Sequence, residues 1–218
     1  MTKLSKNIVL ISGGVGGAKL AEGLNTLRNV NLSIIGNIAD DEEFHGLRVS
    51  PDIDTLTYTL SRMINRDQGW GLQDDTYNSL SMLKKLGQET WMSLGDLDFG
   101  LHIYRQSRLI QNHRPSDIAK DIAKKLGIRA NIILPSDDKI RTKVKTKTGW
   151  ISFQEYFVKK KCSPKILKLS YAGIKSAKTK GFRARASNGF PQVNVKLGAE
   201  LCHLVDECNV DVPVCVFE

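Results

Sequence analysis

The chain has 218 residues, of which 41% are hydrophobic and 25% are charged, and this composition excludes wholesale disorder. The length suits one large domain, or one domain with an appendage. A formal net charge of +9 fits either nucleic acid or a phosphorylated small anion as the partner, so the charge alone does not choose between them.

The N-terminal sequence and the cysteines indicate a cytoplasmic protein. The apolar run after MTKLSK is too short for a secretory signal or a membrane span, and glycines follow it at once. The cysteines form no CxxC pair and have no histidine at zinc-ligand spacing. We therefore expect no membrane association, and reduced thiols that are buried or incidental at Cys162, Cys202, Cys208 and Cys215.

A strand, a glycine turn and a helix are predicted at the start of the chain. Residues 7–12, NIVLIS, are an apolar run typical of a parallel strand buried on both faces. From Ala18 onward leucines recur at helical spacing, which places SGGVGGAKL, residues 12–20, at a strand-to-helix junction. Backbone N–H groups at such a junction attract phosphate. A merely tight turn is the alternative, because the glycines match neither the P-loop nor the GxGxxG pattern.

The next elements complete a crossover unit and start a second helix. Residues 32–35 predict another short strand, and the polar cluster of residues 37–41 follows it, so strand, helix and strand form a right-handed unit. Ser50 and Pro51 predict a helix start with Asp52 and Asp54 in the first turn. The helix dipole favours carboxylates there, so a structural role is the alternative to a functional one.

The middle of the chain predicts helices and then a further strand. Residues 68–110 are typical of helices broken at Gly87 and Gly95. Residues 116–128 predict an amphipathic helix that Ser116 caps and Gly127 ends. Residues 130–135 then predict a buried strand, and the acidic sequence SDD follows it at residues 136–138.

Residues 139–148 alternate between cations on one face and apolar or hydroxyl side chains on the other, which predicts one strand of a hairpin turning near Thr148 and Gly149. A solvated edge strand protected by its charges is one interpretation, and an anion-facing surface is the other. Nucleic acid is the least favoured ligand for such an anion-facing surface, because no aromatic residues alternate with the charges. The cations are Lys139, Arg141, Lys143, Lys145 and Lys147.

Carboxylates recur where predicted strands end or predicted helices begin. Carboxylates that meet at the strand ends of an α/β sheet can bind a divalent cation and deprotonate an attacking hydroxyl, as phosphoryl transfer requires. Each group alone also fits a cap or a turn, so they are informative only together. They occupy residues 39–41, 52–54, 74–75, 95–98 and 136–138.

Taken in order, these motifs resemble the 2-phospho-L-lactate transferase family of deazaflavin coenzyme biosynthesis. The matching stretches lie within residues 8 to about 177, and the order of SPDIDT and FQEYFV is their most specific feature. The resemblance implies an α/β fold: a Rossmann-like, mostly parallel sheet with helices on both faces, plus a helical insertion. The stretches are SGGVGGAKL, NIADD, GLRVSPDIDTLTYTL, GWGLQDDTYN, ETWMSLGDLDFGLH, GIRANIILPSDD and TGWISFQEYFV.

The resemblance also implies an activity. The family transfers a 2-phospho-L-lactyl or phosphoenolpyruvyl group from a guanylyl-activated donor to the ribityl hydroxyl of a 7,8-didemethyl-8-hydroxy-5-deazariboflavin acceptor. The reaction releases GMP with Mg²⁺ present and belongs to coenzyme F(420) biosynthesis. A homodimer is implied as well. The alternative is a non-catalytic regulator of the same fold that binds a nucleotide or sugar nucleotide.

Matching positions carry implied roles. Asp54 would hold Mg²⁺ and orient or deprotonate the attacking hydroxyl. Asp54, Ser93 and Asp96 would contact the deazaflavin, although Ser93 and Leu97 stand where the family usually has cations. The donor's phosphates and nucleotide would lie against Gly13, Gly14, Gly16, Lys19, Asn37, Asp40, Asp41, Ser136, Asp137 and Asp138.

The composition of the chain changes near residue 178. The resemblance stops there, whereas the family continues with a loop rich in glycine and proline that helps to bind the nucleotide. We therefore expect a Rossmann-like domain over residues 1–178, with the C-terminal part of the family fold missing. Residues 179–218 would be an atypical, non-native tail, explained by a frameshift or a truncated gene sequence.

Overall fold

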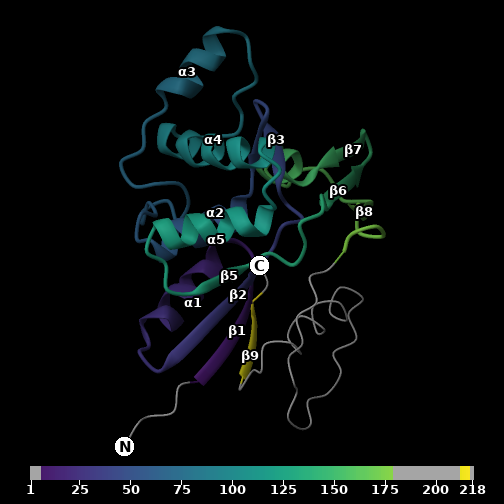
Figure 1. Cartoon of the computed structure of the whole chain (residues 1–218). Helices are drawn as coiled ribbons and strands as arrows, with labels where there is room; N and C mark the ends of the chain where they lie inside the picture. The colour runs from purple at the N-terminus through teal and green to yellow at the C-terminus, as the bar shows by residue number, and fades with distance from the viewer. Residues whose placement is uncertain (1–5, 179–211, 217–218) are drawn as a thin grey trace, which may run out of the picture.

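The computed structural model describes residues 6–178 and 212–216, and its central feature is a four-stranded parallel sheet (Figure 1). The strand order is β5-β2-β1-β9, and every neighbouring pair is parallel. Parallel neighbours need long crossover connections, and helices provide them here. The sheet confirms the α/β fold with a mostly parallel sheet. Its strands are β1 (Lys6–Ser12), β2 (Val30–Gly36), β5 (Asn131–Ile133) and β9 (Val212–Val216).

Helix α1 (Gly14–Thr26) begins earlier than expected. The leucine periodicity predicts a start at Ala18, but the helix begins at Gly14, whose φ of 59° lies in the left-handed region that glycine adopts without strain. The glycines therefore form the first turn of the helix instead of a loop before it. That turn lies at the end of β1, where the sheet presents its carboxyl edge.

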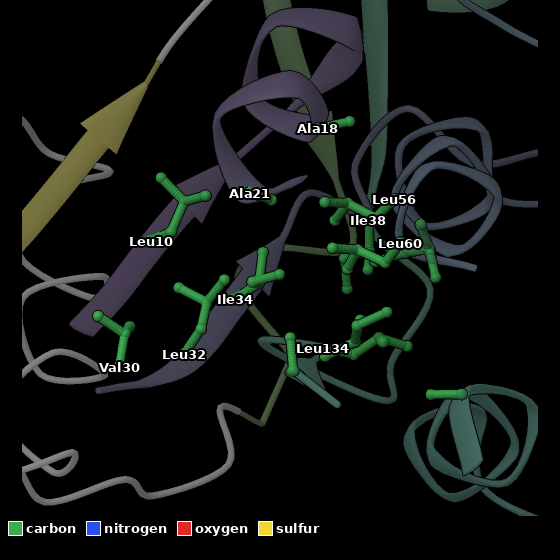
Figure 2. Close-up of a cluster of buried hydrophobic side chains, with 14 residues drawn as sticks. Leu10, Ala18, Ala21, Val30, Leu32, Ile34, Ile38, Leu56, Leu60 and Leu134 are labelled. Carbon is green, nitrogen blue, oxygen red and sulfur yellow. The ribbon is translucent and has the colours of Figure 1, made fainter. Parts of the chain in front are cut away.

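The main core lies between the sheet and three helices, which are α1, α2 (Pro51–Leu60) and α5 (Pro115–Lys125). Leu10 of β1, Ile34 of β2 and Leu56 of α2 are completely buried there, as Figure 2 shows for the labelled side chains. The alternation of β1 and β2 directs these residues to one face of the sheet. The resemblance also implies helices over the opposite face, and this part of the expectation stays a prediction.

Two helices, α3 (Asn78–Lys85) and α4 (Asp96–Ile110), confirm the predicted helical insertion. Helix α3 ends just before the predicted break at Gly87, and α4 begins just after the predicted break at Gly95. A short antiparallel hairpin, β3 (Glu42–Phe44) and β4 (Leu47–Val49), is an unpredicted element. Its turn residues His45 and Gly46 both have positive φ, as a two-residue hairpin turn of the favoured twist requires.

Helix α5 begins at Pro115, so the prediction that Ser116 caps it is wrong. Proline fixes a helical φ and needs no N–H partner at the first position, so the cap is Arg114, two residues before Ser116. Ser116 lies inside the first turn, and its backbone N–H donates to the Asp137 carboxylate at 2.8 Å. Gly127, with φ of 67°, follows the helix end as predicted.

A second, antiparallel sheet has the order β7-β6-β8. The hairpin of β6 (Arg141–Thr146) and β7 (Gly149–Ser152) is confirmed, but the edge-strand interpretation is wrong because β8 (Lys168–Ala172) covers the other side of β6. Nor do the charges form one solvated stripe, because Arg141 is buried and Lys139 pairs with Glu43. A short π-helix, η1 (Glu155–Lys159), follows β7.

The C-terminal segment and the cysteines are partly described. Strand β9 pairs with β1, so part of the 179–218 segment has a place in the sheet, and the division at residue 178 stays a prediction. Cys162 is an exposed free thiol; Cys202, Cys208 and the side chain of Cys215 lie outside the described residues. In the part of the chain that the structure describes, no helix is long and apolar enough to cross a membrane.

Candidate functional site

Asp52 lies at the centre of a hydrogen-bonded cluster at the carboxyl ends of β1 and β2. Its Oδ1 accepts from the backbone N–H of Gly14 at 2.8 Å, and its Oδ2 accepts from the Asn37 amide at 2.8 Å. The same amide nitrogen donates to Asp40 at 2.7 Å. We refer to Gly14, Asn37, Asp40 and Asp52 as the glycine–carboxylate cluster. It joins the N-termini of α1 and α2 to the loop after β2.

Burial makes both carboxylates of this cluster unusually basic. Desolvation raises the pKa of Asp52 to about 6, although hydrogen bonds from Gly14 and Asn37 oppose the shift. Burial also raises the pKa of Asp40, against hydrogen bonds from Thr142 and Asn37. Two adjacent carboxylates that share one amide donor are stabilised by any cation bound between them. Perturbed, converging groups of this kind are typical of functional sites.

The other predicted phosphate-binding residues near α1 are only partly brought together. Gly13 precedes α1, and a β-carbon there would lie 3.6 Å from Asp52 Oδ2, so its backbone lines the cluster. Gly16 lies in the first turn of α1 and is half-buried. Lys19 is exposed one turn further along the helix. From sequence, Asp52, the residue at the centre, was interpreted as a helix-dipole residue and as part of the acidic group 52–54, with no role of its own.

Asp41 differs from Asp40 because an arginine neutralises it. Its Oδ2 accepts from Arg48 at 2.8 and 3.0 Å and from the Ser50 hydroxyl at 2.9 Å, and the residue is only 2% exposed. Burial raises the pKa of Asp41, opposed chiefly by the charge of Arg48. These contacts fix the β3–β4 hairpin against the start of α2. The position of Asp41 indicates a structural function.

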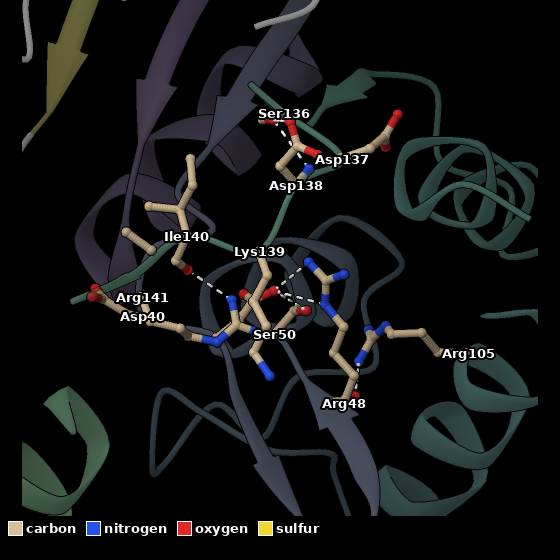
Figure 3. Close-up of polar contacts among 12 residues, drawn as sticks. Asp40, Arg48, Ser50, Arg105, Ser136, Asp137, Asp138, Lys139, Ile140 and Arg141 are labelled. Atoms are coloured by element: carbon tan, nitrogen blue, oxygen red, sulfur yellow. Dashed lines mark hydrogen bonds and ion pairs between the residues drawn. The ribbon is translucent and has the colours of Figure 1, made fainter. Parts of the chain in front are cut away.

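Asp54 is buried in an ion pair between α2 and α4. Its carboxylate accepts from both terminal nitrogens of Arg105, one of them at 3.2 Å, and from the backbone N–H of Ser50 at 3.1 Å. Arg105 also donates to the backbone C=O of Arg48 at 3.0 Å (Figure 3). Among the described residues, no three His, Cys, Asp or Glu side chains gather as a metal-binding group. The hydrogen-bond partners of the Asp54 side chain are thus Ser50 and Arg105, which lie outside the glycine–carboxylate cluster.

A second buried contact joins the same two helices. The hydroxyl of Tyr58 donates to Asp98 at 2.5 Å, and His102 Nε2 lies 4.0 Å from the same carboxylate oxygen. Burial raises the pKa of Asp98 to about 6 and lowers that of His102 to about 4. His102 is therefore neutral at pH 7, and Asp98 is charged.

Asp98 makes the stability of the fold depend on pH. Its folded-state pKa of about 6 exceeds the unfolded value of about 3.9, so the folded chain retains the proton between these values. This contribution is fully present below about pH 4 and is lost as the pH rises through 6. We expect the unfolding free energy of the wild type, relative to Asp98→Asn, to fall between mildly acidic and neutral pH in urea titrations. A difference independent of pH would contradict this assignment.

The residues implied for deazaflavin binding have structural partners or are exposed. Asp96 accepts from the backbone N–H of Ser79 at 2.8 Å and of Asn78 at 3.1 Å, and from the Thr76 hydroxyl, so it caps α3. These hydrogen bonds hold the pKa of Asp96 well below its usual range. Ser93 is exposed in the loop before α4. A cap of this kind leaves Asp96 little freedom to meet a substrate.

The acidic sequence after β5 binds neighbouring backbone (Figure 3). Ser136 is buried, and its hydroxyl donates to the C=O of Lys178 at 2.8 Å. Asp138 accepts from the N–H of Lys178 at 2.5 Å, and Asp137 holds the first turn of α5. These contacts fix residues 136–138 between α5 and the end of the described segment.

Comparison with known proteins places the chain in a family. The model of the family described as 2-phospho-L-lactate transferase CofD matches residues 8–185. The chain belongs to the CofD family. This finding confirms the resemblance carried by SPDIDT and FQEYFV, and it extends the match slightly beyond the predicted limit near residue 177.

Curated CofD relatives agree with this assignment. The 2-phospho-L-lactate transferase of Methanococcoides burtonii is 37% identical over 78% of this chain and 56% of its own length. The phosphoenolpyruvate transferase of Streptomyces griseus is 35% identical over the same shares. The chain thus spans about half the length of the curated relatives it matches.

A solved structure supports the fold. Protein BH3568 of Bacillus halodurans, described as a member of the UPF0052 family, superposes with a TM-score of 0.55 and 19% identity. The superposition covers 81% of this chain and 53% of the other. At this identity the likeness supports the α/β architecture alone.

Proposed function

We propose that the protein transfers a 2-phospho-L-lactyl or phosphoenolpyruvyl group from a guanylyl-activated donor to the ribityl hydroxyl of a deazaflavin. In this reaction the ribityl oxygen forms a bond to the donor's outer phosphorus while the phosphoanhydride bond to GMP breaks. The hydroxyl proton passes to a base, and GMP leaves. Membership of the CofD family supports the reaction class. The observation that carries the site is the glycine–carboxylate cluster.

The cluster offers what this chemistry needs. Gly14 belongs to a helix N-terminus, which favours phosphate, and a phosphate there would lie next to the paired carboxylates Asp40 and Asp52. Oxygen ligands suit Mg²⁺, and a cation bound at Asp40 would offset the cost of burying that charged carboxylate. When bound, Mg²⁺ would offset charge on the phosphates. Asp52, with a pKa of about 6, is positioned to accept the hydroxyl proton.

Asp54 has a different role in the proposal. The resemblance implies that Asp54 binds the metal and contacts the deazaflavin, whereas in the structure its carboxylate is paired with Arg105. As a metal ligand it would have to exchange that arginine for the cation, so we propose Asp40 as the first ligand, with Asp52 beside it as the base, and Asp54 as the residue that becomes available on substrate binding. The ion pair also favours a second candidate function, nucleotide binding without transfer.

The Asp52→Asn substitution tests the assignment. We expect it to lower GMP release, measured chromatographically with deazaflavin, donor and Mg²⁺, by about 10²-fold or more, because the base is lost. The matched control is Asp67→Asn in the exposed loop after α2, which should leave the rate unchanged. Release unaffected by Asp52→Asn would contradict the role. Tight guanine-nucleotide binding with no release by the wild type would favour the second candidate.

The proposal includes a homodimer, as the resemblance implies. Light scattering during size-exclusion chromatography would give the mass in solution directly, and a monomeric mass at micromolar concentration would contradict it.

A further inference from the structure

A cavity rich in lysine lies at the end of the second sheet, away from the glycine–carboxylate cluster. Its volume is about 560 Å³, within the range of small-molecule sites. It lies between the β6–β7 turn and the segment after η1. The residues that line it are Thr146, Lys147, Thr148, Lys159, Lys160, Lys161, Ser163, Pro164 and Lys165. Five of these nine are lysines and none is acidic.

The charges of this cavity are incompletely neutralised. Lys159 pairs with Glu89 at 3.1 Å, and Lys160 with Glu155 at 3.4 Å. For Lys147, Lys161 and Lys165, no carboxylate within residues 6–178 or 212–216 lies within ion-pair distance. Three ammonium groups around one hollow repel one another, and a bound anion would remove that repulsion.

The backbone that carries the lysines is well fixed. The N–H of Cys162 donates to the C=O of Tyr156 at 3.0 Å, and the N–H of Ser163 donates to the C=O of Lys160 at 3.0 Å. The hydroxyl of Tyr156 closes the turn on the C=O of Cys162 at 3.2 Å. Lys161 and Cys162 both adopt positive φ, of 49° and 57°, to make this turn. The lysines therefore extend from a defined frame.

The cavity is separate from the proposed active site. Strand β6 runs from Arg141, whose charge acts on Asp41, to Thr146 in the cavity wall. At about 3.3 Å per residue these two ends are about 17 Å apart. In Figure 1 the β6–β7 hairpin extends away from the parallel sheet.

We propose that this cavity binds a small anion with two or more adjacent phosphate groups. Lysines bind phosphate as point charges, and five of them line this one hollow. The hydroxyls of Thr148 and Ser163 add uncharged donors. A hollow of about 560 Å³ that opens to solvent has room for a short oligophosphate.

Calorimetric titration with inorganic triphosphate tests the proposal. The test variant is Lys147→Gln/Lys161→Gln/Lys165→Gln, and the matched control with the same charge change is Lys84→Gln/Lys85→Gln/Lys124→Gln on α3 and α5. We expect at least tenfold weaker triphosphate binding in the test variant and less than twofold change in the control. GMP release should stay at the wild-type rate in both, so this test is independent of the proposed function.

Three results would overturn the inference. The first is triphosphate binding by the test variant equal to that of the wild type. The second is citrate binding as tight as triphosphate binding at the same ionic strength, because the site would then lack phosphate selectivity. The third is a single-stranded oligonucleotide that binds more tightly than triphosphate and is not displaced by it, which would indicate a nucleic-acid surface. Equal thermal midpoints of the two variants would verify that both are folded.

Discussion

Asp54→Asn is expected to lower the unfolding free energy by about 3–5 kcal/mol, because it leaves the Arg105 charge buried without a partner. Both side chains are under 10% exposed, and the pair joins α2 to α4 across 51 residues of sequence. Urea unfolding at pH 7 measures the change. The same variant should also lose GMP release, so the rate must be expressed per folded molecule.

Two further variants separate the fold from the reaction at this position. Asp54→Leu/Arg105→Met removes both charges, and such replacements are often neutral or stabilising. We therefore expect its urea unfolding midpoint to be higher than that of Asp54→Asn. Asp121→Asn breaks the exposed pair with Lys125 and should barely move the midpoint. An Asp54→Asn chain as stable as Asp121→Asn would show that the buried pair contributes nothing. If Asp54→Leu/Arg105→Met recovers the stability but releases no GMP, the result would support a role for Asp54 in the reaction itself.

The elements of the main sheet could be predicted because each carries its signal locally. Residues 7–12 and 32–35 are apolar runs that end at glycine or at a polar cluster, and they became β1 and β2. Pro51 and the two following aspartates mark the start of α2. These patterns depend on neighbours in sequence, so no tertiary contact was needed to interpret them.

The elements that were missed depend on contacts between distant segments. Strand β8 is only five residues long and exposed throughout, so no buried face marks it, and its pairing with β6 makes β6 an inner strand. The hairpin β3–β4 is too short to show alternation. A three-residue strand gives no periodic signal, and the alternation of five exposed residues is too short to stand out.

The candidate site shows the same limit. The glycine-rich sequence and the NIADD cluster were located correctly at the ends of β1 and β2, because strand ends of a parallel sheet meet at one edge. The sequence does not tell Asp52 from Asp54, which lie two residues apart on α2. Their surroundings differ, because one faces Gly14 and Asn37 and the other faces Arg105. Arg105 belongs to α4, 51 residues further along the chain than Asp54, so no local pattern distinguishes the two aspartates.

Gly17→Ala should lower the unfolding free energy by about 1–3 kcal/mol through overpacking. A β-carbon at Gly17 would lie 2.2 Å from Ser12 Oγ and 3.2 Å from the Ser12 backbone, so α1 would have to move away from β1. The glycine at this position is therefore needed for helix packing. Because the displaced helix carries Gly14, we also expect weaker guanine-nucleotide binding, measured by calorimetry on the folded variant.

Gly23 gives a matched control on the same helix. A β-carbon there meets nothing within 4 Å, so Gly23→Ala should raise the unfolding free energy by about 0.5–1 kcal/mol, through helix propensity and a less flexible unfolded chain. The two substitutions are chemically identical and should have opposite signs. Ser12→Ala, which removes the nearest clashing atom, should recover part of the loss in the double variant. Equal effects of the two alanines would mean that the glycines of α1 act through helix propensity alone, and that α1 is not held against β1 by close contact at Gly17.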